Sequence, residues 1–293
     1  GSDQLWVSNY NEMLGYTFYL DFADARKKKI AYATSLGYAK YNGSEEDKKI
    51  VSILLKRFDG ISVRENSGVE LCKNEFNVDA RRMLDPVFLC DISHYNLLAD
   101  DSRIIEKEKY LLCYILDPTE EKRRAVRELE SHYHIKSCVI LDMKNYEKCY
   151  QTWHDENIIT NVGIEEFVYL IKNCDFLLTD SLHGASFGII YHKNIAVVAN
   201  PRRGRARFDS LFRLLDIESV LWEEGQLDKL VKNIVPVDYV SIDRILEKER
   251  NISWTWLQEI LFSEKNREET MEDIFAKYFN ELQRERIKNT VKN

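Results

Sequence analysis

The sequence predicts an α/β protein built from two Rossmann-like modules that face each other, with a helical extension at the C-terminal end. Two observations support this prediction. Short apolar segments of strand length alternate with segments whose apolar residues recur at helical spacing, and the alternation starts again near the middle of the chain. The 293 residues are enough for two domains, which we expect at residues 1–97 and 98–240, followed by the helical extension at residues 241–293.

The first module follows the order strand, helix, strand, helix, strand. Ser44 is the expected N-cap of its first helix, and Pro86 closes its last strand because proline has no N–H to donate. Alternation of this kind is typical of a parallel sheet with helices on its faces. The predicted elements are strands over 29–34, 60–64 and 82–84 and helices over 45–58 and 66–73.

The second module repeats the pattern and contains a complete βαβ unit. Two such modules facing each other would hold a ligand cleft between them, at the carboxyl ends of both sheets. The predicted elements are strands over 110–116, 137–141, 176–179 and 195–199 and helices over 119–131, 163–173, from 182 onward and over 208–215.

The extension from residue 241 is predicted to be largely helical, with one apolar stripe. We favour packing of this stripe on the body of the protein over a membrane-surface role, because the polar face mixes charges of both signs. The stripe comprises Met271, Ile274, Phe275, Tyr278, Phe279 and Leu282.

Composition argues against several classes of protein. A net charge of −7 and a pI near 5.6 argue against nucleic-acid binding, which needs a basic face. The longest apolar stretches have the length of a strand, so we expect no transmembrane helix. The six cysteines contain no C-x-x-C pair, and no signal-peptide pattern is seen. We therefore expect free thiols in a cytoplasmic protein that contacts a membrane at most peripherally, at its inner face.

The segment 175–184 carries the strongest chemical signal. A buried strand leads directly into polar residues and a helix start, where backbone N–H groups and a partial positive charge stabilise an anion. His183 would lie at the cleft edge and suits proton transfer near neutral pH, with Asp180 as a second catalytic candidate. Gly184 would let a ligand approach the backbone, and Ser181 is a further binding candidate. The alternative is an ordinary helix start, with Asp180 or Ser181 as N-cap and His183 on the surface.

A run of arginines follows the strand over 195–199. Arg202, Arg203, Arg205 and Arg207 lie within six residues of an otherwise acidic protein. Guanidinium groups bind phosphate and carboxylate groups bidentately, so the run indicates a local anion site. The alternative is a solvated loop paired with nearby acids.

Candidate residues also end two strands of the first module. Arg64 ends one of them at the edge facing the expected cleft, where it would contact the same ligand. Its alternative is an ion pair with Glu65 or a helix-capping contact. Ser35 and Gly37 end another strand and are binding candidates, or else they form a plain turn.

Several familiar chemical motifs are missing. The sequence has no G-x-G-x-x-G after a strand, no Walker loop, no G-x-S-x-G elbow and no H-E-x-x-H. His132 and His134 lack carboxylate or thiolate partners at ligand spacing. We expect neither a metal nor a bound cofactor.

In order along the chain, several segments resemble the polysaccharide pyruvyl transferase family. No single segment is decisive, but the ordered set is specific and spans most of residues 1–215. The matching segments are 1–6, 30–37, 61–68, 84–86, 179–184 and Arg203-Gly204 with Arg207-Phe208.

The resemblance implies a GT-B-like arrangement of two domains with the active site between them. It also implies phosphoenolpyruvate as donor substrate and a glycan or lipid-linked sugar as acceptor, in the biosynthesis of a capsule, exopolysaccharide or other cell-envelope polymer. By the same resemblance, Arg64 binds the anionic groups of the donor and His183 acts in or beside proton transfer. Family members usually have α/β sequence before the segment matching residues 1–6, so we expect the first module to lack its opening strands here.

One position departs from the family pattern. Characterised members often carry an arginine two positions before the histidine, where this chain has Ser181. Arg203 or Arg207 is then the candidate for anchoring the donor. Two other functions remain open: a nucleotide-sugar-dependent glycosyltransferase of the same architecture, and a non-catalytic glycan-binding protein on this fold.

Overall fold

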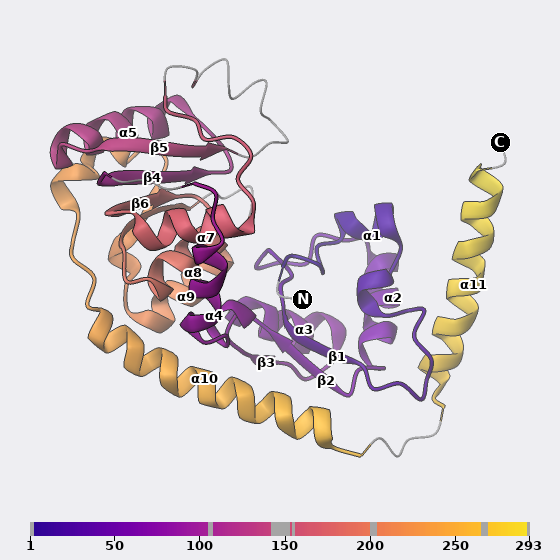
Figure 1. The fold of residues 1–293 in the computed structure, drawn as a ribbon. Helices are drawn as coiled ribbons and strands as arrows, with labels where there is room; N and C mark the ends of the chain where they lie inside the picture. The colour runs from indigo at the N-terminus through magenta and orange to yellow at the C-terminus, as the bar shows by residue number, and fades with distance from the viewer. Residues whose placement is uncertain are drawn as a thin grey trace. The chain divides into compact units, whose positions relative to one another are not determined.

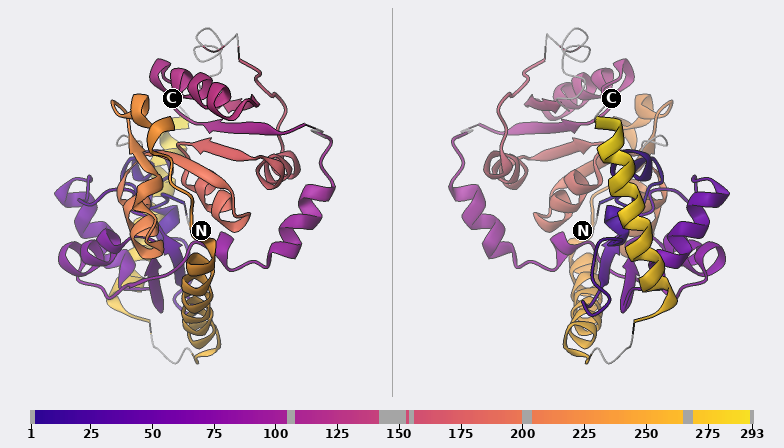
Figure 2. Two further views of the ribbon diagram at one scale, coloured as in Figure 1. Left: turned by 90° about the vertical axis from the view of Figure 1, so that its left-hand side faces the viewer. Right: turned by 90° about the vertical axis from the view of Figure 1, so that its right-hand side faces the viewer.

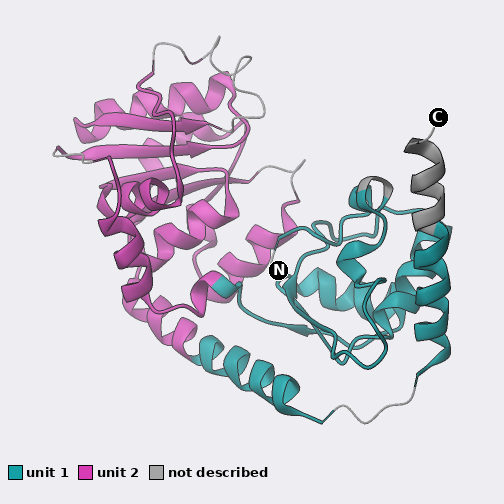
Figure 3. Cartoon of the chain, turned by 45° about the vertical axis from the view of Figure 1, so that its right-hand side comes forward, with its two compact units in different colours: residues 1–86, 248–293 teal, residues 87–247 magenta. Residues whose placement is uncertain are grey.

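The computed structural model describes residues 3–104, 108–141, 153, 156–199, 204–264 and 269–291 (Figure 1). The predicted α/β class is confirmed, since two parallel sheets carry helices on their faces and two long helices end the described chain. The chain forms two compact units, one of Gly1–Pro86 with Lys248–Asn293 and one of Val87–Glu247 (Figure 3). The expected cleft between modules stays a prediction.

A three-stranded parallel sheet in the order β1-β2-β3 forms the centre of the first unit. Its first crossover helix starts where the hydroxyl of Ser44 accepts the backbone N–H of Asp47, as expected of an N-cap. The strands are β1 (Ile30–Thr34), β2 (Gly60–Val63) and β3 (Arg81–Arg82), and the helices before and between them are α1 (Asn9–Leu14), α2 (Glu45–Leu55) and α3 (Asn66–Phe76).

The N-terminal segment completes the core of this unit. Trp6 is buried, stacks on Tyr19 with ring centroids 5.5 Å apart, and donates its indole N–H to the carbonyl of Phe18. Together with apolar residues of β2, α2 and α3, these rings form one buried cluster. Burial also raises the pKa of the Cys72 thiol in this cluster to about 12, so this cysteine is inert at neutral pH.

The two C-terminal helices connect the end of the chain to the first unit. α10 (Tyr239–Phe262) starts in the second unit and ends in the first, and α11 (Met271–Val291) belongs to the first. In α11 the carboxylate of Asp273 lies 2.9 Å from Nε of Arg57 and 3.8 Å from Nζ of Lys29, and all three side chains are buried. Two cations from the body of the unit therefore meet one anion from the tail.

The apolar stripe predicted for α11 does not pack as one surface. Phe275 and Phe279 are partly buried and Ala276 is buried, whereas the side chains at the other predicted positions are exposed. The buried face is displaced because Asp273 and Asn280 also turn inward, to Arg57 and to Asp21. The exposed members are Met271, Ile274, Tyr278 and Leu282.

A five-stranded parallel sheet in the order β5-β4-β6-β7-β8 forms the centre of the second unit. Helix α5 covers one face and α7 and α8 cover the other, as Figure 1 and Figure 2 show. The strands are β4 (Tyr110–Ile115), β5 (Lys136–Leu141), β6 (Phe176–Thr179), β7 (Asn194–Ala199) and β8 (Leu221–Glu223), and the helices are α4 (Ile92–Asp100), α5 (Glu120–Tyr133), α7 (Ile164–Asn173), α8 (Leu182–Ile190) and α9 (Ala206–Leu215).

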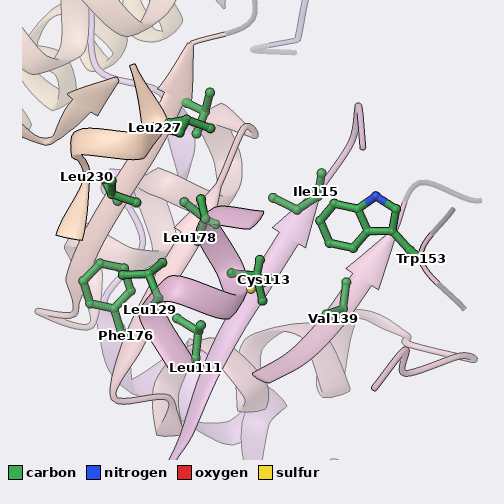
Figure 4. Packing of buried hydrophobic residues seen from close by; sticks show 14 of the residues in the cluster. Leu111, Cys113, Ile115, Leu129, Val139, Trp153, Phe176, Leu178, Leu227 and Leu230 are labelled. Carbon is green, nitrogen blue, oxygen red and sulfur yellow. The ribbon is translucent and has the colours of Figure 1, made fainter. Parts of the chain in front are cut away.

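Beneath α5, apolar side chains of neighbouring strands form the core on that face (Figure 4). Cys113, Leu178 and Val139 come from β4, β6 and β5, and Trp153 closes one side of the cluster with no exposed surface. Consecutive buried residues in β4 and β6 are typical of parallel strands covered on both faces.

Three of the helices and strands were not predicted from the sequence: α1, α4 and β8. The predicted domain boundary at residue 97 falls within α4, which packs on α7 of the second unit. The predicted boundary at residue 240 falls within α10. None of the helices in the described part of the chain combines the length and the apolar character needed to cross a membrane.

Candidate functional site

The strand order of the second unit creates a switch point between β4 and β6. From β4 the chain moves outward to β5, then returns across β4 and continues through β6 in the opposite direction. Loops leaving two such neighbouring strands run to opposite faces of the sheet, and ligands bind at this place in open parallel sheets. Residues 180–184 of the predicted segment 175–184 leave the carboxyl end of β6 and therefore lie at the switch point.

Asp180 joins the two loops of the switch point. Its Oδ1 accepts the backbone N–H of Leu116 at 2.6 Å, and its Oδ2 accepts the N–H of Asp117 at 3.0 Å. Oδ2 also lies 2.9 Å from Nζ of Lys122, and neither side chain has exposed surface. These contacts give Asp180 a structural role in the loops, and its predicted catalytic role stays a prediction.

Lys122 is a site residue that the sequence analysis missed. Besides Asp180, its ammonium contacts the carbonyl of Asp117 at 2.7 Å and Oε1 of Glu224 at 3.0 Å. The lysine lies in the first turn of α5 within a run of charged residues. Nothing in the local sequence distinguishes this buried cation from its exposed or half-buried neighbours in the same run.

Ser181 and Gly184 shape the start of α8. Ser181 is the N-cap, and its hydroxyl accepts the backbone N–H of Gly184 at 3.2 Å. A Cβ atom on Gly184 would lie 2.6 Å from Oγ1 of Thr179 and 2.9 Å from a ring carbon of Tyr114. The glycine therefore lets α8 lie against β4 and β6, and the local alternative of an N-capped helix start is present in the structure.

His183 is the second residue of α8 and is half-buried. It is the only titratable side chain in the first turn of the helix, whose other residues are Leu182, Gly184 and Ala185. Its backbone environment is the one predicted, a helix N-terminus at the carboxyl end of a parallel strand. The histidine thus combines partial exposure with a position at the switch point.

Only part of the arginine run lies in the described residues. Arg207 is buried at the start of α9, donates from Nε to the carbonyl of Gly204 at 3.3 Å and stacks on Phe208. Arg205 pairs with Asp209 and Glu223, as the alternative of a loop bonded to nearby acids expects. Arg202 and Arg203 lie outside the described residues.

Arg64 follows β2 in the first unit as a buried guanidinium. Its side chain is 3% exposed, and one terminal nitrogen donates to Oδ2 of Asp85 at 2.9 Å. Its Nε and its other terminal nitrogen are buried without a hydrogen-bond partner, although Glu65 and Asp3 lie 4.0 and 3.8 Å away. Unpaired N–H groups in a buried cation are costly, and an incoming anion would satisfy them.

Glu65 organises the loop after β1. Its Oε1 accepts the hydroxyl of Ser35 at 2.9 Å and the backbone N–H groups of Leu36 and Gly37 at 2.7 and 3.2 Å. Burial raises the pKa of this carboxyl, while Arg64 and these three donors oppose the rise. Ser35 and Gly37 thus bind an acid of the protein itself, which positions their loop beside Arg64.

The structure therefore brings seven of the nine predicted residues together in two groups, while Arg207 lies at the start of α9 and Arg203 outside the described residues. Asp180, Ser181, His183 and Gly184 share the start of α8, and Ser35, Gly37 and Arg64 share the carboxyl edge of the first sheet. Within the described residues, no three His, Cys, Asp or Glu side chains gather in a way that would hold a metal ion.

Comparisons with known proteins relate this chain to one family. A sequence profile described as polysaccharide pyruvyl transferase matches residues 1–202. The search of curated protein sequences gave no match.

Among solved structures, the fold is similar to a UDP-GlcNAc 2-epimerase from Neisseria meningitidis bound to UDP-GlcNAc, at 14% identity and a TM-score of 0.46 over 79% of this chain and 70% of that one. It is also similar to the wall teichoic acid polymerase TagF, at 11% identity and a TM-score of 0.37 over 92% and 68% of the two chains. An S. aureus MnaA–UDP co-structure gives 14% identity and a TM-score of 0.38 over 82% and 71%.

Proposed function

The chain belongs to the polysaccharide pyruvyl transferase family, and we propose that it transfers a pyruvyl group from phosphoenolpyruvate to a sugar of a polysaccharide or lipid-linked glycan. The product is a ketal and the leaving group is phosphate. The family match over residues 1–202 is the observation that carries this proposal. The reaction belongs to the assembly of a capsule, an exopolysaccharide or another cell-envelope polymer, in the cytoplasm or at the inner face of the membrane.

The side chain of Arg64 supports a dianionic or trianionic donor. Two of its N–H-bearing nitrogens are buried without a hydrogen-bond partner, in a side chain that pairs with Asp85. A carboxylate or phosphate oxygen would supply charge-assisted hydrogen bonds to them, each stronger than a neutral one. Glu65 keeps Ser35 and Gly37 in place next to this cation.

His183 supports the proton transfers that the reaction needs. Protonation of the methylene carbon of phosphoenolpyruvate leaves an oxocarbenium-like centre at the adjacent carbon. One sugar hydroxyl adds to that carbon, phosphate leaves, and a second hydroxyl adds to close the ketal. Of the two hydroxyl protons, one ends on the new methyl group and the other leaves with phosphate. A partly exposed histidine at a helix start, where an anion is also favoured, suits this exchange.

The departure at position 181 has a local explanation. Ser181 caps α8 through Gly184, so the helix start is formed without an arginine at this position. Donor anchoring then rests on Arg64, with Arg203 and Arg207 as further candidates. Arg207 already lies on Phe208 with one bond to a carbonyl oxygen, which fixes its orientation.

Titration and turnover test the proposal together. We expect the full chain to bind phosphoenolpyruvate in a calorimetric titration and to bind UDP-sugars at least about a hundredfold more weakly. With a panel of glycan acceptors, phosphate release should accompany the mass gain of one pyruvyl group on the acceptor. Binding of a nucleotide sugar without phosphoenolpyruvate would support a glycosyltransferase instead. Glycan binding without phosphate release would support a non-catalytic binding protein.

A further inference from the structure

A cavity of about 560 Å³ with no assigned ligand lies at the carboxyl ends of β4 and β5, on the other side of β4 from β6. Tyr114, Ile140 and Phe167 form apolar walls, while Thr160 and Ile164 lie at its exposed rim. This volume is within the range of roughly 300–1,000 Å³ that small-ligand pockets occupy, and apolar walls with a few polar groups are typical of such pockets.

The lining of this cavity suits a neutral ligand. None of the described residues that line it is a lysine, arginine, histidine, aspartate or glutamate. The N-terminus of α7 lies at the rim of the cavity, and a carboxylate of the same helix already occupies it, because Glu166 accepts the backbone N–H of Gly163 at 2.9 Å. A dianion such as phosphoenolpyruvate would find no counter-charge among these residues.

One wall residue of the cavity, Tyr114, also packs against the first turn of α8. The ring of Tyr114 lies so close to Gly184 that a Cβ atom added to this glycine would be 2.9 Å from a ring carbon. The carbonyl of Tyr114 also accepts the hydroxyl of Thr179 at 2.7 Å. Tyr114 therefore lies between the cavity and Gly184, the residue that follows His183 in the first turn of α8.

We propose that this cavity binds a pyranose ring of the acceptor glycan, an inference that rests on the proposed pyruvyl transfer. A pyranose has an apolar face of C–H groups, which packs on aromatic rings such as that of Phe167, and a rim of hydroxyls. At the mouth of the cavity, the exposed polar side chains of Thr160 and Asn161 offer hydrogen bonds to those hydroxyls.

Ile164→Glu tests the proposal without disturbing the core. Ile164 is 69% exposed at the first position of α7, where an acidic side chain is favoured by the helix dipole. The matched control is Leu97→Glu, because Leu97 is 65% exposed on α4 of the same unit and does not line the cavity. The probes are methyl glycosides of glucose, galactose, mannose and N-acetylmannosamine. Saturation-transfer NMR measures their binding, and steady-state kinetics with phosphoenolpyruvate measures their KM.

We expect Ile164→Glu to raise the dissociation constant or KM of the best glycoside by about tenfold or more, with donor affinity within about twofold of wild type. Phe167→Leu, which keeps the cavity apolar but removes the aromatic ring, should weaken glycoside binding by a smaller factor. Leu97→Glu should match wild type. If the wild-type enzyme transfers pyruvyl groups and Ile164→Glu leaves the glycoside KM unchanged, the sugar site is overturned and the proposed function stands. A wild-type chain that binds glycosides through Ile164 but transfers no pyruvyl group would support the sugar site and overturn the proposed function.

Discussion

The side chain of Arg64 is buried and that of His183 is partly exposed, and this difference separates their expected roles. The guanidinium of Arg64 is buried, and two of its nitrogens have no hydrogen-bond partner, so its contribution depends on an anion reaching it. His183 is partly exposed in the first turn of a helix, so its contribution depends on exchanging a proton with a ligand. Binding of the donor and turnover should therefore respond separately to the two side chains.

We expect Arg64→Lys to raise the dissociation constant of phosphoenolpyruvate about tenfold or more, because a lysine keeps the charge beside Asp85 but loses the planar fork of donors. His183→Asn should keep the dissociation constant of phosphoenolpyruvate within a few-fold of wild type and lower turnover by roughly a hundredfold, since the asparagine amide neither gains nor loses a proton near neutral pH. Calorimetry and a phosphate-release assay measure the two effects.

Two matched variants control this prediction. Arg82→Lys changes an arginine in the same sheet that pairs with Glu249, and His192→Asn changes an exposed histidine that pairs with Asp243. Both should bind and turn over like wild type. Near-normal turnover by His183→Asn would remove His183 from the mechanism and leave it as a residue of the helix start.

At the scale of elements, the most consequential contact joins α11 to the first sheet and its neighbours. Asp273 is the acidic partner in a buried cluster with Lys29 and Arg57, whose remaining N–H groups bond backbone carbonyls. Removing one partner of a buried ion pair leaves an uncompensated charge, which costs about 3–5 kcal/mol. Two cations share this one carboxylate, so the first unit depends on the tail helix electrostatically as well as through Phe279 and Ala276.

Asp273→Asn should therefore lower the free energy of unfolding by about 3 kcal/mol or more in urea titrations at neutral pH. Glu272→Gln, one residue earlier in the same turn, should leave unfolding close to wild type. An unfolding midpoint for Asp273→Asn equal to that of Glu272→Gln would show that the cluster contributes no net stability.

At the scale of the whole molecule, the compact units do not follow the order of the chain. The first unit takes up Lys248–Asn293 after the second unit is complete, as Figure 3 shows by colour. Lys28 holds the end of α10 there, because its ammonium donates to the carbonyls of Ile260 and Leu261 at 2.7 and 3.0 Å. Ser253 of the same helix accepts the backbone N–H of Leu84.

A chain ending at Glu247 should consequently lose structure in the first unit and keep it in the second. We expect backbone amides of β1 and β2 to lose hydrogen-exchange protection, while those of β4 and β6 keep theirs, because the cluster around Asp273 and the contacts of α10 are removed. Equal loss of protection in both sheets would mean that the units fold as one cooperative body.

The sequence alone determined the α/β class, nearly every strand, and the segment where polar residues follow β6. These features are local: apolar runs, helical spacing, and Ser44 and Ser181 as caps can all be read from neighbouring residues. Only the tertiary structure decided which partners the polar residues take. Asp180 bonds Lys122 across 58 residues, Glu65 bonds Ser35 across 30, and Asp273 meets Arg57 across 216. Such pairings depend on strand order and on the return of the tail, and neither leaves a local signal, because burial of a charge is set by what folds over it.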